Sequence, residues 1–139
     1  MASILNPYIS FKDNARQALE FYQETFGGEL TVSTFGEYGD PSQPGADGIM
    51  HGNLKTPAGF TIMAADTPPG MDYTPGTNIS VSLSGDGGDG DELRGYWDKL
   101  SADGTVSVPL EKQMWGDEFG MCTDQFGIGW MVNIAGTPA

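Results

Sequence analysis

The chain has 139 residues, and its formal net charge of −13 excludes more functions than any other bulk property. Nucleic acids attract basic protein surfaces, and so do anionic membranes, so we expect neither as a partner of this acidic protein. The single cysteine, Cys122, excludes an intramolecular disulfide and favours a cytoplasmic location. We expect neither a signal peptide nor a membrane span, because no segment has the required apolar run.

The first half of the chain predicts a strand, a helix and three further strands. The strand covers residues 4–11, and the helix runs from Asp13 or Asn14 to the glycine pair at 27–28. Apolar residues recur along it at steps of three and four, as in a buried helical stripe: Ala15, Ala18, Leu19, Tyr22 and Phe26. The remaining elements are a strand, a loop and a hairpin, over 30–35, 36–48 and 49–65.

The second half repeats this order after a linker. Two proline–glycine pairs break any regular element over 67–76. Residues 77–84 alternate between apolar and polar side chains, with Ile79, Val81 and Leu83 on the predicted buried face. A helix follows with a second apolar stripe: Leu93, Tyr96, Trp97 and Leu100. A strand from Val106 and a hairpin over 115–133, turning at Asp124, complete the half.

The repeated order of strand, helix, strand, strand, strand predicts an internal duplication. We assign module one to residues 1–66, the linker to 67–76 and module two to 77–136, within one α+β domain of residues 1–139. Each module leaves one sheet face uncovered, so we expect curved mixed sheets around a cleft that binds a small molecule. Exposed sheet edges also predict a homodimer.

Short motifs occur in order along nearly the whole chain: residues 6–11, 18–22, 26–28, 49–54, 76–81, 115–120 and 124–127 with Trp130. Together they resemble the vicinal oxygen chelate superfamily of glyoxalases, bleomycin-resistance proteins and dioxygenases, and within it the PhnB-like branch. The resemblance implies two βαβββ modules and, commonly, a homodimer. It gives no single activity, because this fold hosts isomerases, thiol transferases, dioxygenases and drug-binding proteins.

Metal-dependent members of the superfamily hold a divalent ion with His, Glu or Gln on the first and last strands of each module. The resemblance places the four corresponding positions at Asn6, Met63, Asn78 and Met131. Amide oxygens alone are weak ligands and thioethers are soft, so these side chains do not suit the hard ions of the family. We therefore expect no metal site and no cofactor; a divalent metal is the alternative.

His51 is the only histidine, and strand alternation places it on one face with Ile49 and Asn53. The resemblance makes it a pocket residue, and imidazole can transfer protons near neutral pH. The alternative, which we favour, is a hydrogen-bonded histidine in the pocket wall without chemistry. Ile128 stands where the family often has a second histidine, which weakens the case for catalysis further.

Large aromatic and sulfur side chains predict the rest of a ligand pocket with His51: Tyr8, Met63, Trp115, Phe119 and Trp130. For any single one of them, a place in the core is the alternative. Asp117 and Glu118 are adjacent on a strand and point to opposite faces, so we do not expect a general acid/base pair.

Two other features resemble sites but have simpler explanations. Cys122 lies in a strand between Met121 and Thr123, where a thiol is expected to be a small buried hydrophobe rather than a nucleophile. Residues 85–92 are rich in carboxylates but lack the spacing of a calcium loop, so we expect them to cap a helix.

We therefore predict a small-molecule-binding, glyoxalase-like protein that lacks the superfamily metal. The alternatives are a metal-dependent lyase, isomerase or dioxygenase that uses His51, and a drug-binding protein of the bleomycin-resistance kind. Whether the chain is an enzyme stays open at this stage. A methyltransferase is not expected, because the sequence has no nucleotide-binding strand–loop–helix pattern.

Overall fold

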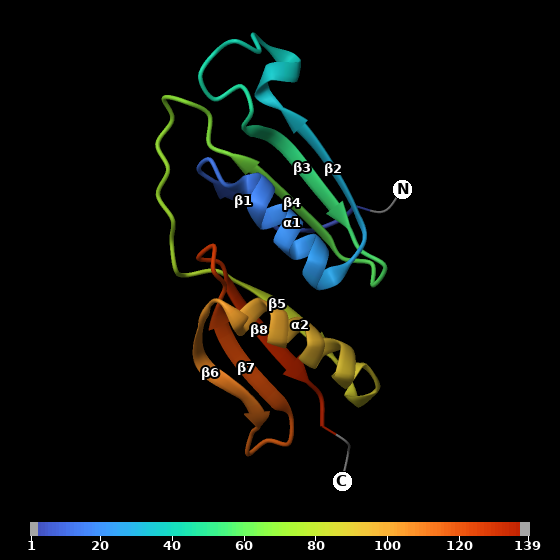
Figure 1. The fold of residues 1–139 in the computed structure, drawn as a ribbon. Coiled ribbons are helices and arrows are strands. Elements are labelled where there is room, and N and C mark those ends of the chain that lie inside the picture. Colours follow the sequence, from blue (N-terminus) through green and yellow to red (C-terminus); the bar gives the residue numbers. More distant parts are fainter. Residues whose placement is uncertain (1–2, 137–139) are drawn as a thin grey trace. The chain divides into compact units, whose positions relative to one another are not determined.

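A computed structural model describes residues 3–136, and the chain divides into two compact units between Pro75 and Gly76. The division falls at the end of the predicted linker, 67–76. Each unit holds one four-stranded mixed sheet and one long helix (Figure 1). The predicted α+β class and the two βαβββ modules are therefore confirmed.

Unit one contains the elements β1 (Tyr8–Phe11), α1 (Ala15–Phe26), β2 (Glu29–Thr34), η1 (Phe35–Tyr38), β3 (Ile49–Lys55) and β4 (Thr61–Asp66). Its strands lie in the order β1-β4-β3-β2, with β1 parallel to β4 and the other neighbours antiparallel. The first strand is shorter than the predicted span of 4–11, since regular pairing with β4 begins only at Tyr8.

The helix α1 covers one face of this sheet (Figure 1). Its predicted apolar stripe is buried, together with side chains from the strands beneath it: Ala15, Ala18, Leu19, Tyr22, Phe26, Ile49, Leu54, Ile62 and Ala64. Burial of this face supplies the hydrophobic stabilisation of unit one. In the described part of unit one no helix covers the opposite face, and that face carries polar residues of β2 and β3.

A buried carboxylate ties the helix of unit one to its sheet. Asp66 is 6% exposed and accepts the backbone N–H of Ala15 at 3.0 Å and that of Ile49 at 2.7 Å. The first bond satisfies an N–H that the start of a helix leaves unpaired. Asp66 thereby takes over the capping function, because the side chain of Asn14 makes no cap bond.

Unit two contains β5 (Ser80–Gly85), η2 (Gly87–Asp89), α2 (Gly90–Ala102), β6 (Thr105–Lys112), β7 (Glu118–Thr123) and β8 (Gly129–Ile134). Its strand order, β5-β8-β7-β6, repeats that of unit one. The predicted helical stripe from Leu93 to Leu100 is buried. The strand predicted over 77–84 begins late, at Ser80, so the prediction of a buried Ile79 is wrong: this side chain is 80% exposed.

Each unit contains a close backbone contact of its own, and the two contacts lie at corresponding positions. Gly28 follows α1, and a Cβ atom added there would overlap the carbonyl oxygen of Lys55 at the end of β3. Gly104 follows α2, and a Cβ atom there would overlap the carbonyl oxygen of Thr123 at the end of β7. Only glycine allows this approach without a backbone shift. The matched pair supports the duplication that the order of elements predicts.

Candidate functional site

The uncovered face of unit one contains a hollow of about 330 Å³. Its lining comes from alternate residues of the neighbouring strands β2 and β3: Glu29, Thr31, Ser33, His51, Asn53 and Lys55. Antiparallel register sets them in three cross-strand pairs, in which Glu29 faces Lys55, Thr31 faces Asn53 and Ser33 faces His51. The hollow is therefore polar, whereas the sequence predicted an apolar pocket walled by aromatic rings.

A register shift between Ser33 and Thr34 changes which residues share this face. Ile49 is fully buried on the helix side, although simple alternation predicted that it lies beside His51 and Asn53. An irregularity in strand pairing reverses the side on which the next side chain lies. The prediction for Ile49 is therefore wrong, while His51 and Asn53 do share the open face.

Tyr8 lies on the edge strand β1 and reaches His51 of β3 across the intervening strand β4. Its hydroxyl lies 3.3 Å from Nδ1 of His51, and the two ring centroids are 5.8 Å apart at 37°. This contact ties Nδ1 to a protein partner, so that Nε2 is the ring nitrogen left for another hydrogen bond. Met63 pairs directly with both Tyr8 and Asn53 in the sheet register. Three of the predicted pocket residues, Tyr8, His51 and Met63, thus lie on one face of one unit.

Asn53 carries an unusual polar atom. Its side-chain oxygen Oδ1 is shut off from solvent and has no hydrogen-bond partner. Leaving such a group unpaired costs about 1–3 kcal/mol. Buried polar groups in native proteins are nearly always paired, so an exception in the wall of a hollow suggests that a ligand provides the missing donor.

The predicted metal positions lie in separate halves of the chain. Asn6 precedes β1 and donates its side-chain N–H to the carbonyl of Pro7, whereas Tyr8 is the residue that faces Met63. In unit two, Asn78 precedes β5, and Met131 faces Ser82. Among the described residues, no three or more His, Cys, Asp or Glu side chains form a possible metal cluster. Amide and thioether donors do not fit the divalent ion of the superfamily.

The three pocket residues predicted in unit two differ in environment. Trp115 is 61% exposed beside Phe119, with ring centroids 6.3 Å apart. Trp130 is only 1% exposed, and its indole N–H donates to Oδ2 of Asp124 at 2.8 Å. Asp124 also accepts two backbone N–H groups of the turn, from Phe126 and Ile128. Trp130 is therefore a core residue rather than part of a pocket wall, the alternative that its sequence left open.

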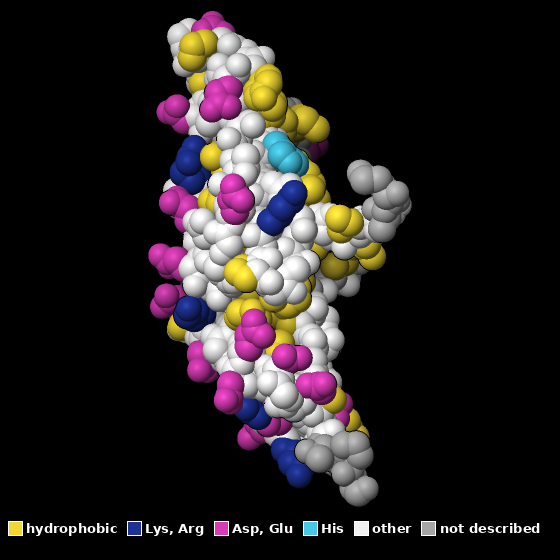
Figure 2. Space-filling model, turned by 90° about the vertical axis from the view of Figure 1, so that its right-hand side faces the viewer, with side chains coloured by type: hydrophobic (Ala, Val, Ile, Leu, Met, Phe, Trp, Pro, Cys, Tyr) yellow, Lys and Arg dark blue, Asp and Glu magenta, His cyan; other side chains and the backbone are white. Residues whose placement is uncertain are grey.

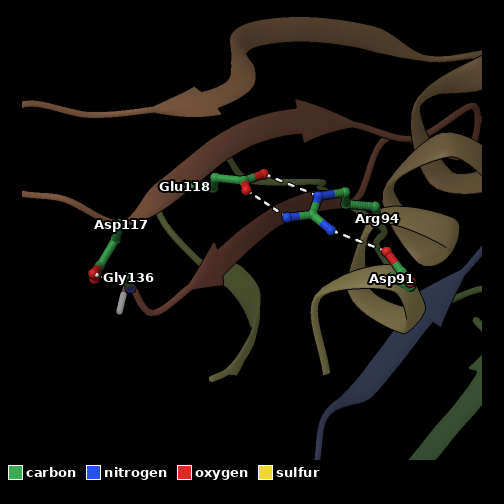
Figure 3. Close-up of polar contacts among 5 residues, drawn as sticks. All are labelled: Asp91, Arg94, Asp117, Glu118 and Gly136. Carbon is green, nitrogen blue, oxygen red and sulfur yellow. Dashed lines mark hydrogen bonds and ion pairs between the residues drawn. The ribbon is translucent and has the colours of Figure 1, made fainter. Parts of the chain in front are cut away.

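Two adjacent carboxylates, one just before β7 and one at its first residue, turn to different partners, as predicted. Figure 3 shows Glu118 pointing to Arg94 of α2 and Asp117 pointing to Gly136. Glu118 forms a bidentate pair with Arg94 at 2.5 and 3.1 Å, which lowers the pKa of its carboxyl. The Gly136 N–H, and then the Asn133 amide, lower the pKa of Asp117. Both groups are engaged in holding unit two together.

The other two sequence features also have structural explanations. Cys122 is buried, and burial, followed by the charge of Asp124, raises the pKa of its thiol to about 11. A thiol so reluctant to ionise is a poor nucleophile, as predicted. In the acidic segment, Asp86 caps the short helix η2 by accepting the Gly88 N–H at 2.9 Å. The cap therefore serves η2, while the side chain of Asp89 at the start of α2 makes no cap bond.

The surface reflects the acidic composition. Figure 2 shows Asp and Glu side chains spread along the viewed face with fewer Lys and Arg side chains between them. No described helix is both long enough and apolar enough to span a membrane.

Comparison with known proteins identifies the family. A family profile described as 3-demethylubiquinone-9 3-methyltransferase matches residues 3–133. The chain belongs to this family. Protein YjdN of Escherichia coli K12 is 32% identical over 143 positions, which cover 94% of each chain. The crystal structure of protein PA1353 from Pseudomonas aeruginosa superposes with a TM-score of 0.81 at 34% sequence identity. The alignment covers 96% of this chain and 98% of that one.

More distant structures share the fold. The PhnB protein from Bacillus cereus, described as a putative 3-demethylubiquinone-9 3-methyltransferase, has a TM-score of 0.73 at 21% identity. The alignment covers 96% of this chain and 100% of that one. A glyoxalase/bleomycin resistance/dioxygenase domain from Frankia has a TM-score of 0.67 at 13% identity, with 100% and 96% covered. The family profile thus confirms the predicted PhnB-like family, and these structures confirm the glyoxalase-like fold.

Proposed function

We propose that this chain binds a small polar organic molecule in the hollow of unit one, without the divalent ion of the superfamily. The unpaired Oδ1 of Asn53 is the observation that carries the proposal. It lies in a hollow whose other five lining side chains all contain hydrogen-bonding groups. A volume of about 330 Å³ is at the lower end of the range for small-molecule sites, about 300–1,000 Å³.

His51 is the second contact we assign to the ligand. Tyr8 occupies Nδ1 at 3.3 Å, so Nε2 remains for a donor or acceptor on the bound molecule. This arrangement supports binding by an oriented imidazole. It also favours the hydrogen-bonded wall histidine over a histidine that relays protons to a metal, because the metal positions carry Asn and Met.

The family description does not lead us to propose methyl transfer. The connection between β1 and α1 is Lys12-Asp13-Asn14, without the glycines that let a helix approach a nucleotide phosphate. The sheets are mixed and four-stranded rather than doubly wound and parallel. We therefore propose that the chain binds a small molecule, and we do not propose that it transfers a methyl group.

Mass spectrometry of the native, gently purified protein tests the proposal. We expect a small molecule to co-purify with the wild type and to be reduced in His51→Ala and in Asn53→Ala. Asn78→Ala is the matched control, because it removes an exposed amide in unit two. A ligand retained equally by all three variants would place binding outside the hollow. A stoichiometric Mn²⁺, Ni²⁺ or Zn²⁺ ion in the purified protein would contradict the metal-free part.

We also propose that the chain is a homodimer in the cytoplasm. Each sheet ends in two edge strands, β1 and β2 in unit one and β5 and β6 in unit two, and association is a common way to protect such edges. Sedimentation at micromolar concentration tests the dimer, and a monomer alone would contradict it.

A further inference from the structure

The three cross-strand pairs of the hollow differ in a regular way along the strands. One end has the opposite charges of Glu29 and Lys55, and the centre has the hydroxyl of Thr31 opposite the amide of Asn53. The other end has the hydroxyl of Ser33 opposite the imidazole of His51. Successive pairs are two residues apart, so that the pairs span about 13 Å of strand.

The formal charges of the lining cancel. Glu29 and Lys55 contribute one charge of each sign, and the other four lining residues are neutral when His51 is unprotonated. A charged ligand would leave one of the two groups facing a like charge, whereas a neutral ligand can hydrogen-bond to both. Neutrality of the ligand is therefore the arrangement with the least electrostatic cost.

The neutral part of the lining both donates and accepts hydrogen bonds. Hydroxyl groups, as on Thr31 and Ser33, do both, and Nε2 of His51 donates or accepts according to the tautomer of the ring. A ligand hydroxyl is the complementary group, since it also donates and accepts. Several hydroxyls on one small molecule would satisfy successive pairs along the strands.

Asn53 supplies the selective element of this site. Its Oδ1 needs a donor, and the χ2 torsion of an Asn side chain is broad, so rotation of the amide can present this oxygen to the hollow. A ligand hydroxyl that donates to the rotated oxygen gives it the partner that it lacks. A ligand with only acceptors at this point leaves the oxygen unpaired.

We propose that the hollow of unit one recognises a neutral polyhydroxylated molecule, a sugar or sugar alcohol, with Asn53 as the residue that selects for a hydroxyl donor. The proposal rests on the binding function proposed above and specifies its ligand class.

Titration of the full chain followed by ¹H–¹⁵N NMR tests the ligand class. The probes are D-glucose, maltose and myo-inositol as polyols, L-serine as a zwitterion, lactate as an anion and ethanolamine as a cation. We expect saturable shifts at residues 29–33 and 51–55 with at least one polyol and not with the charged probes. Saturation by a charged probe without a polyol overturns the ligand class and leaves the binding function standing.

Two further measurements separate the possible failures. If no polyol shifts these strands, the ligand class is overturned, and native mass spectrometry then decides independently whether the hollow holds another molecule. For a polyol that binds, we expect Asn53→Ala to weaken affinity about tenfold, which corresponds to the loss of one hydrogen bond of about 1.4 kcal/mol. The control Asn78→Ala should leave affinity unchanged, and equal affinity of Asn53→Ala and the wild type would overturn the selective role of Asn53.

Discussion

The open sheet faces of the two units have the same strand order and different chemistry. In unit one, a row across the four strands reads Tyr8, Met63, Asn53 and Thr31. In unit two, the corresponding row reads Ser82, Met131, Met121 and Val108. The first row is mainly polar and borders a hollow, whereas the second is mainly thioether and aliphatic. The shared backbone fixes where these side chains lie, and the residue types decide which face can hold a polar ligand.

The largest expected effect tests what the units have in common. We expect Gly104→Ala to lower the free energy of unfolding by about 3 kcal/mol, because the new methyl group meets the backbone of Thr123. Gly28→Ala should cost more, since Gly28 also has a φ of 108° that alanine rarely adopts. Urea unfolding measures both.

Gly95→Ala is the control for these two variants. Gly95 is exposed in the middle of α2, with no atom within 4 Å of an added Cβ. Alanine there should stabilise the helix by about 0.5–1 kcal/mol. A similar result for Gly104→Ala would show that the backbone contact is not tight.

The next prediction concerns the residue that ends the last strand of each unit, which is charged in one unit and apolar in the other. Asp66 ends β4 of unit one, and Ile134 takes the corresponding place in β8. We expect Asp66→Ala to cost about 2–3 kcal/mol, because two buried N–H groups lose their acceptor. Asp72→Ala, an exposed aspartate of the linker, should change the midpoint of thermal unfolding little, and an equal loss in both variants would contradict the capping role.

One pair of corresponding residues differs in that only one member can ionise, so alkaline pH should affect the stability of unit two through it. Cys122 in unit two corresponds to Leu54 in unit one, and both are buried. The folded protein keeps the thiol protonated up to about pH 11, whereas an unfolded chain releases the proton from about pH 9. The unfolded state then binds fewer protons, so the free energy of unfolding falls as pH rises through this window, by about 2 kcal/mol.

Comparison with Cys122→Ala isolates this contribution. Tyr96, whose pKa burial raises to about 12, adds a loss above pH 10 in both proteins. The wild type should therefore lose more stability than the variant between pH 8 and 11. Parallel pH profiles would show that the thiol ionises equally well in the folded protein.

Asn53→Met places in unit one the residue type that unit two has at the corresponding position, Met121. We expect about a tenfold loss of affinity for a polyol that binds the wild type, because the hydroxyl loses its acceptor. Stability should not fall, since the variant removes an unpaired buried oxygen. Calorimetry measures affinity and thermal unfolding measures stability; Met121→Asn is the control and should create no binding in unit two. Unchanged affinity together with lower stability would make Asn53 a purely structural residue.

The smallest effect concerns the orientation of His51. Tyr8→Phe removes the hydroxyl that lies 3.3 Å from Nδ1 and keeps the ring. We expect about a threefold loss of affinity, because an exposed hydrogen bond contributes about 0.5–1 kcal/mol. The His51 signals in ¹H–¹⁵N NMR should report a shift in tautomer. Identical tautomer populations in the two proteins would exclude an orienting role for Tyr8.

The sequence predicts the architecture well because period and turn chemistry are local. The helical stripes, the glycine ends and the hairpin around Asp124 each depend on a few neighbouring residues. The start of β5 and the place of Ile79 are missed, because strand pairing with β8 decides them and alternation alone does not. Ile49 is missed for the same reason, since a register shift with β2 turns it to the core.

The site is predicted less completely than the fold. His51, Tyr8 and Met63 are brought together as pocket residues, but the lining contributed by Glu29, Thr31, Ser33 and Lys55 is missed. Alternation in residues 29–33 and 51–55 contains this information once the two strands are known to be neighbours. Trp130 shows the opposite problem, because a large aromatic ring fits equally well in a core and in a pocket, and only the bond to Asp124 separates the two.

The backbone contacts at Gly28 and Gly104 also bear on the history of the chain. After a segment is copied, side chains on an open surface can diverge freely, and the two rows across the sheets do differ in chemistry. A position where main chain meets main chain has no such freedom, because every side chain is excluded there. These two glycines are therefore the places to align first when the halves are compared with each other or with an ancestral protein of half this length.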